Sequence, residues 1–222
     1  MSFNILQQYK TLVFDCDGVV LNSNKVKTDA FYEVALPFGE QAAQAFVAYH
    51  TTNGGISRYK KFVHFLQTIV PQHAQTVTGP GLEELLDAYA SLVRRSLLNC
   101  EIAPSLQALR EKHANTRWLI VSGGDQAELR EVFAKRNLAH LFDGGIFGSP
   151  DSKDNLLERE LASGNIDRPA LFLGDSKYDY EAATQVGLDF VFLYDWTEVK
   201  DWREWTALKN IVAHKNVAEL GL

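Results

Sequence analysis

The residues of this chain that are best suited to chemistry are aspartates that directly follow apolar runs. Asp15 and Asp17 lie in the segment FDCDG after one run, and Asp175 ends a later run, with Asp179 close behind it. Asp15 and Asp17 are separated by one residue, so an extended backbone would direct both side chains to one face. Gathered carboxylates repel one another unless a cation offsets their charge, and such oxygen ligands suit Mg²⁺. The pattern predicts a magnesium site, although for Asp17 alone a turn or helix N-cap role stays equally open.

Two further segments could hold an anion. Ser122, Gly123 and Gly124 follow another apolar run and precede a helical pattern, and a hydroxyl beside free backbone N–H groups at a helix N-terminus can bind an anion. Lys153 begins a later helical pattern, at the end where the helix dipole disfavours a cation, so a nearby phosphate or carboxylate cluster would explain it. The alternatives are an ordinary strand-to-helix turn for the first segment and an exposed surface lysine for Lys153.

Five short apolar runs must position these residues. They cover residues 11–15, 117–122, 145–148, 170–175 and 189–195. Four of them are rich in Val, Ile, Leu and Phe with little polar alternation, which is typical of parallel strands covered by helices on both faces. Helical patterns separate the later runs, so we expect an α/β fold with a doubly wound parallel sheet. In such sheets ligands bind beyond the carboxyl ends of the strands, where the aspartates lie.

The first two runs are about a hundred residues apart, and this interval has mostly helical patterns. The expected helices cover residues 25–36, 41–49, 58–70 and 82–98, and a further helix over 105–113 leads back to the sheet. We therefore expect residues 1–24 and 100–222 to form the α/β core, and residues 25–99 to form a helical cap domain inserted after the first strand. After the second strand, Asp125 is predicted to cap a helix, with Glu128 as its capping-box partner.

The composition disfavours several classes of partner. The net charge is -6 and no run of five or six Lys and Arg residues occurs, so we expect no nucleic-acid partner. No segment approaches the roughly 18 apolar residues of a membrane span, and the N-terminal residues are too polar for a signal peptide. We expect no membrane association and a cytoplasmic location, with a monomer and a homodimer both open.

Cysteine and histidine do not form ligand patterns here. Cys16 and Cys100 are far apart, which argues against a zinc cluster or a disulfide framework. Cys16 is expected to point into the core, away from its two aspartate neighbours, rather than to act as a catalytic thiol. His50, His64 and His73 lack ligand-like spacing with one another.

In type and order, these segments resemble the motifs of the haloacid dehalogenase superfamily, and in particular its helical-cap phosphatases and β-phosphoglucomutase-like members. The resemblance covers nearly the whole chain, and the sequence DxDG at residues 15–18 is its most specific part. It implies a Rossmann-like core with a cap. It also implies that Asp15 attacks phosphorus to form an aspartyl-phosphate, while Asp17 protonates the leaving oxygen and then activates water.

The same resemblance implies a set of ligands. Mg²⁺ would be held by Asp15, by the backbone carbonyl of Asp17 and by Asp175, and Asp179 would support it indirectly or through water. The oxygens of the transferring phosphoryl group would be held by Ser122, Gly123 and Lys153. Two departures from the family pattern are visible: Asn22 stands where many relatives have Asp, and Lys153 lies in DSKD rather than next to a proline.

The predicted cap supplies two candidate substrate residues. The segment NGGISR, which ends at Arg58, resembles the cap loop of β-phosphoglucomutases, where an Arg grips the far end of a sugar phosphate. Arg58 could bind a second anionic or polar group, or it could be a solvated arginine, and the two readings are equally open. Lys27 stands where those mutases have His. We expect Lys27 to be an exposed helix lysine in preference to a substrate contact.

The resemblance and the residues together lead to one expected function and two alternatives. The first is a phosphatase that hydrolyses a small phosphorylated metabolite, either a sugar phosphate or a phosphorylated acid, with Mg²⁺. The second is a phosphosugar mutase that shares the covalent step, which ranks lower because Lys27 cannot copy the role of a histidine. The third is a non-enzymatic binding protein that retains the fold.

Overall fold

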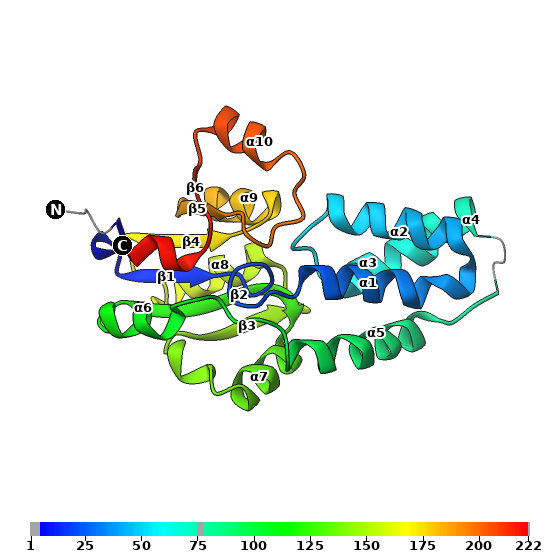
Figure 1. The fold of residues 1–222 in the computed structure, drawn as a ribbon, viewed down its shortest axis with the longest axis horizontal. Coiled ribbons are helices and arrows are strands. Elements are labelled where there is room, and N and C mark those ends of the chain that lie inside the picture. The colour runs from blue at the N-terminus through cyan, green and yellow to red at the C-terminus, as the bar shows by residue number, and fades with distance from the viewer. Residues whose placement is uncertain (1–4, 75–77, 222) are drawn as a thin grey trace.

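A parallel sheet organises the chain. The computed structural model describes residues 5–74 and 78–221, and within them the strands form one six-stranded sheet in the order β3-β2-β1-β4-β5-β6 (Figure 1). The strands are β1 (Thr11–Phe14), β2 (Arg117–Asp125), β3 (Gly145–Ser149), β4 (Ala170–Gly174), β5 (Asp189–Leu193) and β6 (Val212–His214). Every neighbouring pair is parallel. The order extends in both directions from β1, so the sheet is doubly wound, which confirms the predicted fold class.

The strands differ most from the expected runs at two places, and the other bounds agree within two residues. The second strand was expected over 117–122, but β2 continues to Asp125 because the register shifts after Val121 and Asp125 then pairs with Ser149 of β3. Strand β6 was not expected at all. It contains three residues at the edge of the sheet, and Val212 is 47% exposed. Such a short and partly exposed segment has too little apolar sequence to be recognised as a strand.

Helices alternate with the strands from β2 onward, and the earlier helices all lie between β1 and β2. The helices are α1 (Asn24–Ala35), α2 (Glu40–Thr52), α3 (Arg58–His64), α4 (Val70–His73), α5 (Leu82–Leu97), α6 (Leu106–Lys112), α7 (Gln126–Lys135), α8 (Lys153–Ala162), α9 (Lys177–Gln185) and α10 (Trp202–Lys209). The predicted helix over 58–70 consists of α3, a π-helical turn at Phe65–Ile69, and α4. No helix in the described ranges 5–74 and 78–221 is long and apolar enough to cross a bilayer.

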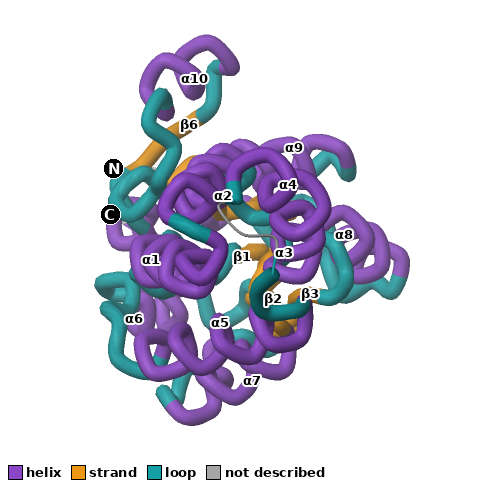
Figure 2. The backbone as a smooth tube through the Cα atoms, turned by 90° about the vertical axis from the view of Figure 1, so that its right-hand side faces the viewer, coloured by secondary structure: helices purple, strands orange, loops and turns teal. Residues whose placement is uncertain are grey.

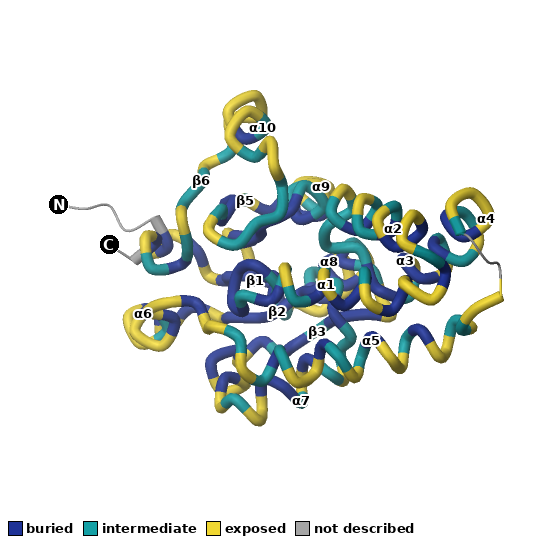
Figure 3. Tube along the Cα trace, turned by 45° about the vertical axis from the view of Figure 1, so that its right-hand side comes forward, coloured by how far each residue is buried: buried dark blue, intermediate teal, exposed yellow. Residues whose placement is uncertain are grey.

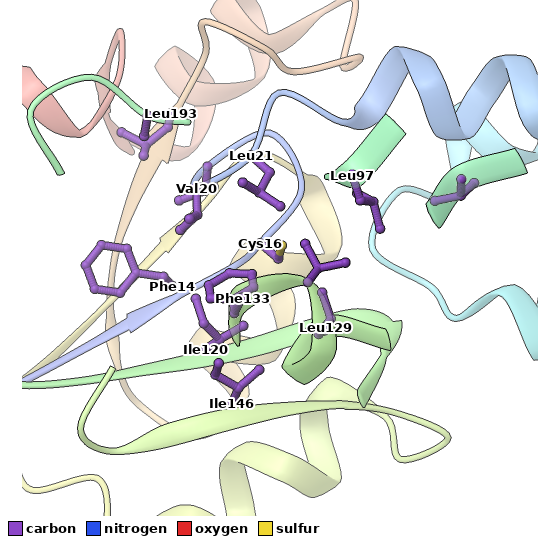
Figure 4. Packing of buried hydrophobic residues seen from close by; sticks show 14 of the residues in the cluster. Phe14, Cys16, Val20, Leu21, Leu97, Ile120, Leu129, Phe133, Ile146 and Leu193 are labelled. Atoms are coloured by element: carbon purple, nitrogen blue, oxygen red, sulfur yellow. The ribbon is translucent and has the colours of Figure 1, made fainter. Parts of the chain in front are cut away.

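Successive residues of each central strand belong to two different cores. Phe14 of β1 and Ile120 of β2 pack with Phe133 of α7, whereas Val13 and Leu119 pack on the opposite face with residues of α8 and α9. The alternation follows from the two-residue period of a strand. Figure 4 shows Cys16 among the apolar side chains of the first core, and Cys16 is fully buried, as expected from the sequence.

Helices α1 to α5 pack together beyond the carboxyl ends of the strands (Figure 1), and in the end-on view of Figure 2 helices α1 to α4 lie in front of the strands. Aromatic side chains fill the space between these helices: the rings of Phe31 and Tyr89 are 4.3 Å apart, and those of Phe46 and Phe65 are 4.4 Å apart. Figure 3 shows that exposed residues line the outer side of α5, while β1 and β2 are largely buried. These helices therefore form a layer above the sheet edge where the aspartates lie. The exact division of the chain at residues 25–99 stays a prediction.

Candidate active site

The carboxyl end of β1 carries a buried carboxylate in contact with a buried cation. Asp15 continues the strand pairing, because its backbone N–H donates to the carbonyl oxygen of Leu173 in β4 at 2.9 Å. Its side chain lies 2.9 Å from Nζ of Lys153, the first residue of α8, and this lysine is 1% exposed. The expectation that a carboxylate cluster lies close to Lys153 is confirmed, and the reading of an exposed lysine is wrong.

Two more aspartates come to the same place from β4 and α9. Oxygen atoms of Asp15, Asp175 and Asp179 all lie within 4.8 Å of one another, and all three residues are buried. Asp179 also forms the capping box of α9, because its Oδ2 accepts from the backbone N–H of Ser176 at 3.0 Å while the hydroxyl of Ser176 accepts from the N–H of Asp179 at 3.2 Å. Its other oxygen contacts Lys153. Asp179 thus has partners on both oxygens, as does Asp15, whose Oδ1 accepts from the N–H of Cys16 at 2.7 Å and whose Oδ2 contacts Lys153.

The charges of this cluster are not balanced by the protein. Burial raises the pKa of Asp15 to about 7, with the nearby Asp179 and Asp17 acting in the same direction and Lys153 acting against them. Burial, followed by the charges of Asp179 and Asp15, also raises the pKa of Asp175 well above its usual range. A divalent cation would offset this excess of negative charge. The donor set, which is all carboxylate oxygen, therefore fits Mg²⁺.

Asp17 meets other partners than Asp15. Its carboxylate accepts from the hydroxyl of Ser23 at 2.5 Å and from Nζ of Lys27 at 2.6 Å, and it is not part of the three-aspartate group. Asp15 and Asp17 nevertheless line the same cavity, as expected from their spacing, and the chain turns directly after Asp17 at Gly18, which has φ +76°. Although burial acts in the opposite direction, Lys27 lowers the pKa of Asp17.

The position of Lys27 differs from the one predicted from the sequence. It was expected to be exposed, but it is 9% exposed and lies at the cavity with its ammonium paired to Asp17. Burial disfavours the charged form, yet the attraction of Asp17 prevails and raises the pKa of Lys27. No sequence signal indicated this pairing, because it depends on how the start of α1 folds back over the end of β1.

The end of β2 contributes mainly backbone groups to the cavity. Ser122 is fully buried, and its Oγ accepts from the N–H of Gly124 at 3.1 Å. Gly123 and Gly124 line the cavity. A Cβ atom at Gly123 would come within 2.1 Å of the carbonyl oxygen of Gly55 in the loop between α2 and α3. The core strand and the cap loop therefore touch backbone to backbone at this point.

Arg58 belongs to a contact between the two helical layers. Its guanidinium pairs with Glu128 of α7 and lies 5.2 Å from the ring centroid of Tyr89 in α5. It lines the cavity but is only 8% exposed, so the reading of a solvated arginine is wrong. Asp125 caps α7 as predicted by accepting from the N–H of Glu128 at 2.8 Å. The predicted capping box is absent, since the Glu128 side chain turns to Arg58 instead.

Sequence reasoning missed a residue that holds Asp175 in place. Asn24, the first residue of α1, donates through Nδ2 to Asp175 Oδ2 at 2.7 Å and to the carbonyl oxygen of Trp196 at 2.9 Å. The two partners of the first bond are 151 positions apart in the chain. An asparagine at the start of a helix is common for local reasons, so no sequence signal pointed to this contact. Asn22, noted for its departure from the family pattern, bonds to Glu101 at the surface.

The cavity between the two layers has a volume of about 70 Å³. Its core side is lined by Asp15, Asp17, Gly123, Gly124, Asp175 and Ser176, and its cap side by Lys27, Phe31, His50, Gly55, Arg58, Lys61 and Tyr89. The aspartates thus face one end of the space and the cations the other, where Glu198 lies 3.8 Å from Nε2 of His50. His50 and Lys61 were not among the candidate residues found from sequence.

The fold and the site define a class: an α/β protein with aspartates at the carboxyl ends of adjacent parallel strands, covered by an inserted helical layer. A model of the haloacid dehalogenase-like hydrolase family matches residues 9–187, and the chain belongs to this family. No curated protein matches the chain.

Solved structures share the fold at low sequence identity. A predicted phosphatase from Clostridium acetobutylicum is 17% identical, with a TM-score of 0.70 and 97% of each chain covered. A predicted phosphoglycolate phosphatase from Haemophilus somnus is 18% identical, with a TM-score of 0.65, over 85% of this chain and 86% of that one. A β-phosphoglucomutase from Clostridium difficile is 15% identical, with a TM-score of 0.69, over 95% and 92%. At this identity the likeness supports a common fold.

Proposed function

We propose that this protein is a Mg²⁺-dependent phosphatase that hydrolyses a small phosphorylated metabolite through an aspartyl-phosphate on Asp15. The observation that carries the proposal is the contact of Asp15 with the fully buried Lys153, in a group of three carboxylates at the sheet edge. A carboxylate nucleophile cannot approach a phosphate dianion unless cations lie beside it. Lys153 supplies one such cation from the protein itself.

The metal would be held by Asp15, by the backbone carbonyl of Asp17 and by Asp175, and Asp179 would act behind them through its contacts with Lys153 and Ser176. When bound, Mg²⁺ supplies positive charge that offsets the carboxylates and the phosphoryl oxygens. Lys153 would also bind a phosphoryl oxygen, together with Ser122 and the backbone N–H groups that follow it.

Asp17 is proposed to exchange protons with the leaving oxygen and then with water. In the free protein Lys27 favours the ionised form of Asp17, so this carboxylate must take up a proton as the negatively charged substrate binds. After the alcohol leaves, the ionised form is restored and can accept a proton from the attacking water. The Lys27 ammonium would then stabilise the carboxylate between the two half-reactions.

A phosphosugar mutase remains the second candidate function, and the ion pair of Arg58 with Glu128 argues against it. An arginine that grips the distant end of a sugar phosphate must be available to the ligand, whereas here Arg58 pairs with Glu128. Product analysis separates the two functions. A phosphatase releases inorganic phosphate, while a mutase returns the phosphoryl group to a second hydroxyl of the same sugar.

The test is phosphate release from a panel of phosphorylated metabolites, measured with Mg²⁺ and with a chelator. We expect release in Mg²⁺ only, and a loss of at least about 10³-fold in Asp15→Asn, because the nucleophile is removed. Lys25→Met, an exposed lysine change on α1, is the matched control and should retain full activity. Unchanged phosphate release by Asp15→Asn would exclude Asp15 as the nucleophile.

A further inference from the structure

One cation at the cavity has no carboxylate beside it. Lys61 of α3 is 2% exposed, and its Nζ lies 2.6 Å from Nδ1 of His50 on α2. The other two cations on the cap side, Lys27 and Arg58, each form an ion pair with a carboxylate. Within residues 5–74 and 78–221, no carboxylate lies within 4.0 Å of the Lys61 ammonium. A buried ammonium without a counter-ion is energetically costly, so this arrangement suits an anion brought by a ligand.

His50 completes the arrangement. Burial, followed by the charges of Lys61 and Lys27, lowers the pKa of His50 to about 2, so its ring is neutral. A neutral imidazole that accepts from Lys61 at Nδ1 has its proton on Nε2. This Nε2 is buried and has no hydrogen-bond partner among the described residues. The pair therefore offers ammonium and imidazole N–H donors at a wall of the cavity.

The surroundings of the pair do not neutralise it. Glu198 is the nearest carboxylate, but its Oε2 is 3.8 Å from Nε2 of His50, and both its oxygens accept from the hydroxyl of Thr28 at 2.8 Å. Phe31 lies on the other side, with its ring centroid 5.6 Å from Nζ of Lys61. Burial and the charge of Lys27 lower the pKa of Lys61 to about 7, which an incoming anion would raise again.

We propose that Lys61 and His50 form a subsite for a second anionic group of the substrate, located on the part of the molecule that leaves as the alcohol. The inference rests on the proposed phosphatase function for the other end of the substrate, at Asp15. The cavity of about 70 Å³ is less than half of the roughly 150 Å³ that accommodates benzene in an engineered protein cavity. With the cap in this position, the substrate is therefore a short phosphorylated compound with a second anion, either a carboxylate or another phosphate.

The test compares three two-carbon compounds that differ in the second group: 2-phosphoglycolate, ethylene glycol bisphosphate, and 2-hydroxyethyl phosphate, whose second group is an uncharged hydroxyl. We expect wild type to have the higher kcat/KM for at least one of the first two, and which one is preferred tells carboxylate from phosphate. Lys61→Met should lower kcat/KM for the preferred compound by about 10- to 100-fold, mainly through KM, because a hydrogen bond to a charged group is lost. It should change kcat/KM for 2-hydroxyethyl phosphate by less than about threefold.

Two controls support this design. Methionine matches the length of lysine and removes an unpaired buried charge, so Lys61→Met should fold. Lys60→Met removes the same charge from the exposed neighbouring position on α3 and should behave as wild type. The inference is overturned if wild type shows no preference for a second anion, or if Lys61→Met lowers kcat/KM for all three compounds equally.

Binding separates this inference from the proposed function. Phosphonoacetate and methylphosphonate are not hydrolysed as phosphate esters, and calorimetry with Mg²⁺ compares their affinities. If no compound releases phosphate but phosphonoacetate binds more tightly than methylphosphonate in a Lys61-dependent way, the subsite stands and the phosphatase function falls. If phosphate is released but Lys61→Met leaves both the preference and the binding unchanged, the function stands and the subsite falls.

Discussion

Asp15 and Asp17 are near neighbours in sequence, yet each is paired with a different lysine. Asp15 meets Lys153 from the core, and Asp17 meets Lys27 from the first cap helix. The two carboxylates therefore experience different environments, which is what a nucleophile and a proton-exchanging group require. The chain turns directly after Asp17, at Gly18.

Gly18 provides the first prediction at the scale of single residues. It has φ +76°, and a Cβ atom there would lie 2.1 Å from Oδ2 of Asp175 and 2.5 Å from Nδ2 of Asn24. We expect Gly18→Ala to lower the free energy of unfolding by about 2–4 kcal/mol. We also expect phosphate release to fall by about 100-fold, because Asp175 must move.

Gly164 offers a matched control for this change. It has φ +74°, but nothing lies within 4 Å of its added Cβ. Gly164→Ala should therefore show only the backbone strain, about 1 kcal/mol, with activity retained. Urea unfolding and phosphate release measured on both variants check the prediction, and equal effects at the two glycines would contradict it.

Lys61 provides a pH-dependent prediction. Its pKa is about 7 in the folded protein, below the ordinary value of 10.5, so between these values the unfolded chain retains a proton that the folded chain has lost. The free energy of unfolding should therefore decrease as the pH is lowered from about 10.5 to about 7, by up to about 1.4 kcal/mol per pH unit from this group. Lys61→Met should remove that contribution, while Lys60→Met should not. Urea unfolding at pH 8, 9 and 10 tests this, and parallel curves for wild type and Lys61→Met would count against it.

At the scale of elements, α7 joins the core to the cap. Glu128 pairs with Arg58 of α3, Asp125 accepts from the hydroxyl of Tyr59 at 2.7 Å, and Glu131 pairs with Arg94 of α5. These contacts differ in burial. The side chains of Arg58 and Glu128 are 8% and 11% exposed, whereas those of Arg94 and Glu131 are 53% and 36% exposed.

Two double-mutant cycles test whether this difference in burial determines the coupling energy of the two ion pairs. With Arg58→Met and Glu128→Gln, we expect a coupling energy of about 2–3 kcal/mol, because each change leaves a buried charge without its partner. With Arg94→Met and Glu131→Gln, the coupling should be at most about 1 kcal/mol, because water screens an exposed pair. Urea unfolding of the single and double variants gives both energies. Equal coupling in the two cycles would show that burial does not control the strength of these pairs.

The elements also show how far the sequence could lead. Strands β1, β2, β4 and β5 were predicted because their buried runs have a strong apolar signal, and Asp15 and Asp175 could be placed together because parallel strands end at one edge. The pairing of Lys27 with Asp17 could not be predicted, since it depends on the path of the turn after β1. The contacts of Glu128 and Asn24 were missed for a similar reason: both residues had a plausible local role at a helix start.

At the scale of the molecule, the proposed metal site links segments from the two ends of the core. Asp15 comes from the first strand and Asp175 follows the fourth, so a bound cation would stabilise the folded chain and not the unfolded one. At a Mg²⁺ concentration about ten times Kd, this gain is about 1.4 kcal/mol, and we expect Tm to rise by about 3–6 °C.

Asp175→Asn should abolish this rise. In chelator the same variant should be at least as stable as wild type, because a buried carboxylate beside Asp15 and Asp179 is removed. Thermal unfolding of both proteins, with Mg²⁺ and with chelator, measures the four values. An equal rise in Tm for wild type and Asp175→Asn would show that Asp175 is not a ligand.

The backbone contact between Gly123 and Gly55 determines how closely the end of β2 approaches the loop between α2 and α3. A Cβ atom added at position 123 would lie 2.1 Å from a backbone carbonyl oxygen, which cannot rotate away as a flexible side chain can. Alanine at this position would therefore push the strand and the cap loop apart. A bulkier residue would increase the separation of the strand and the cap loop further and would admit bulk water to the reacting groups. The absence of a side chain at position 123 thus determines how closely the strand and the cap loop approach each other over the reacting groups.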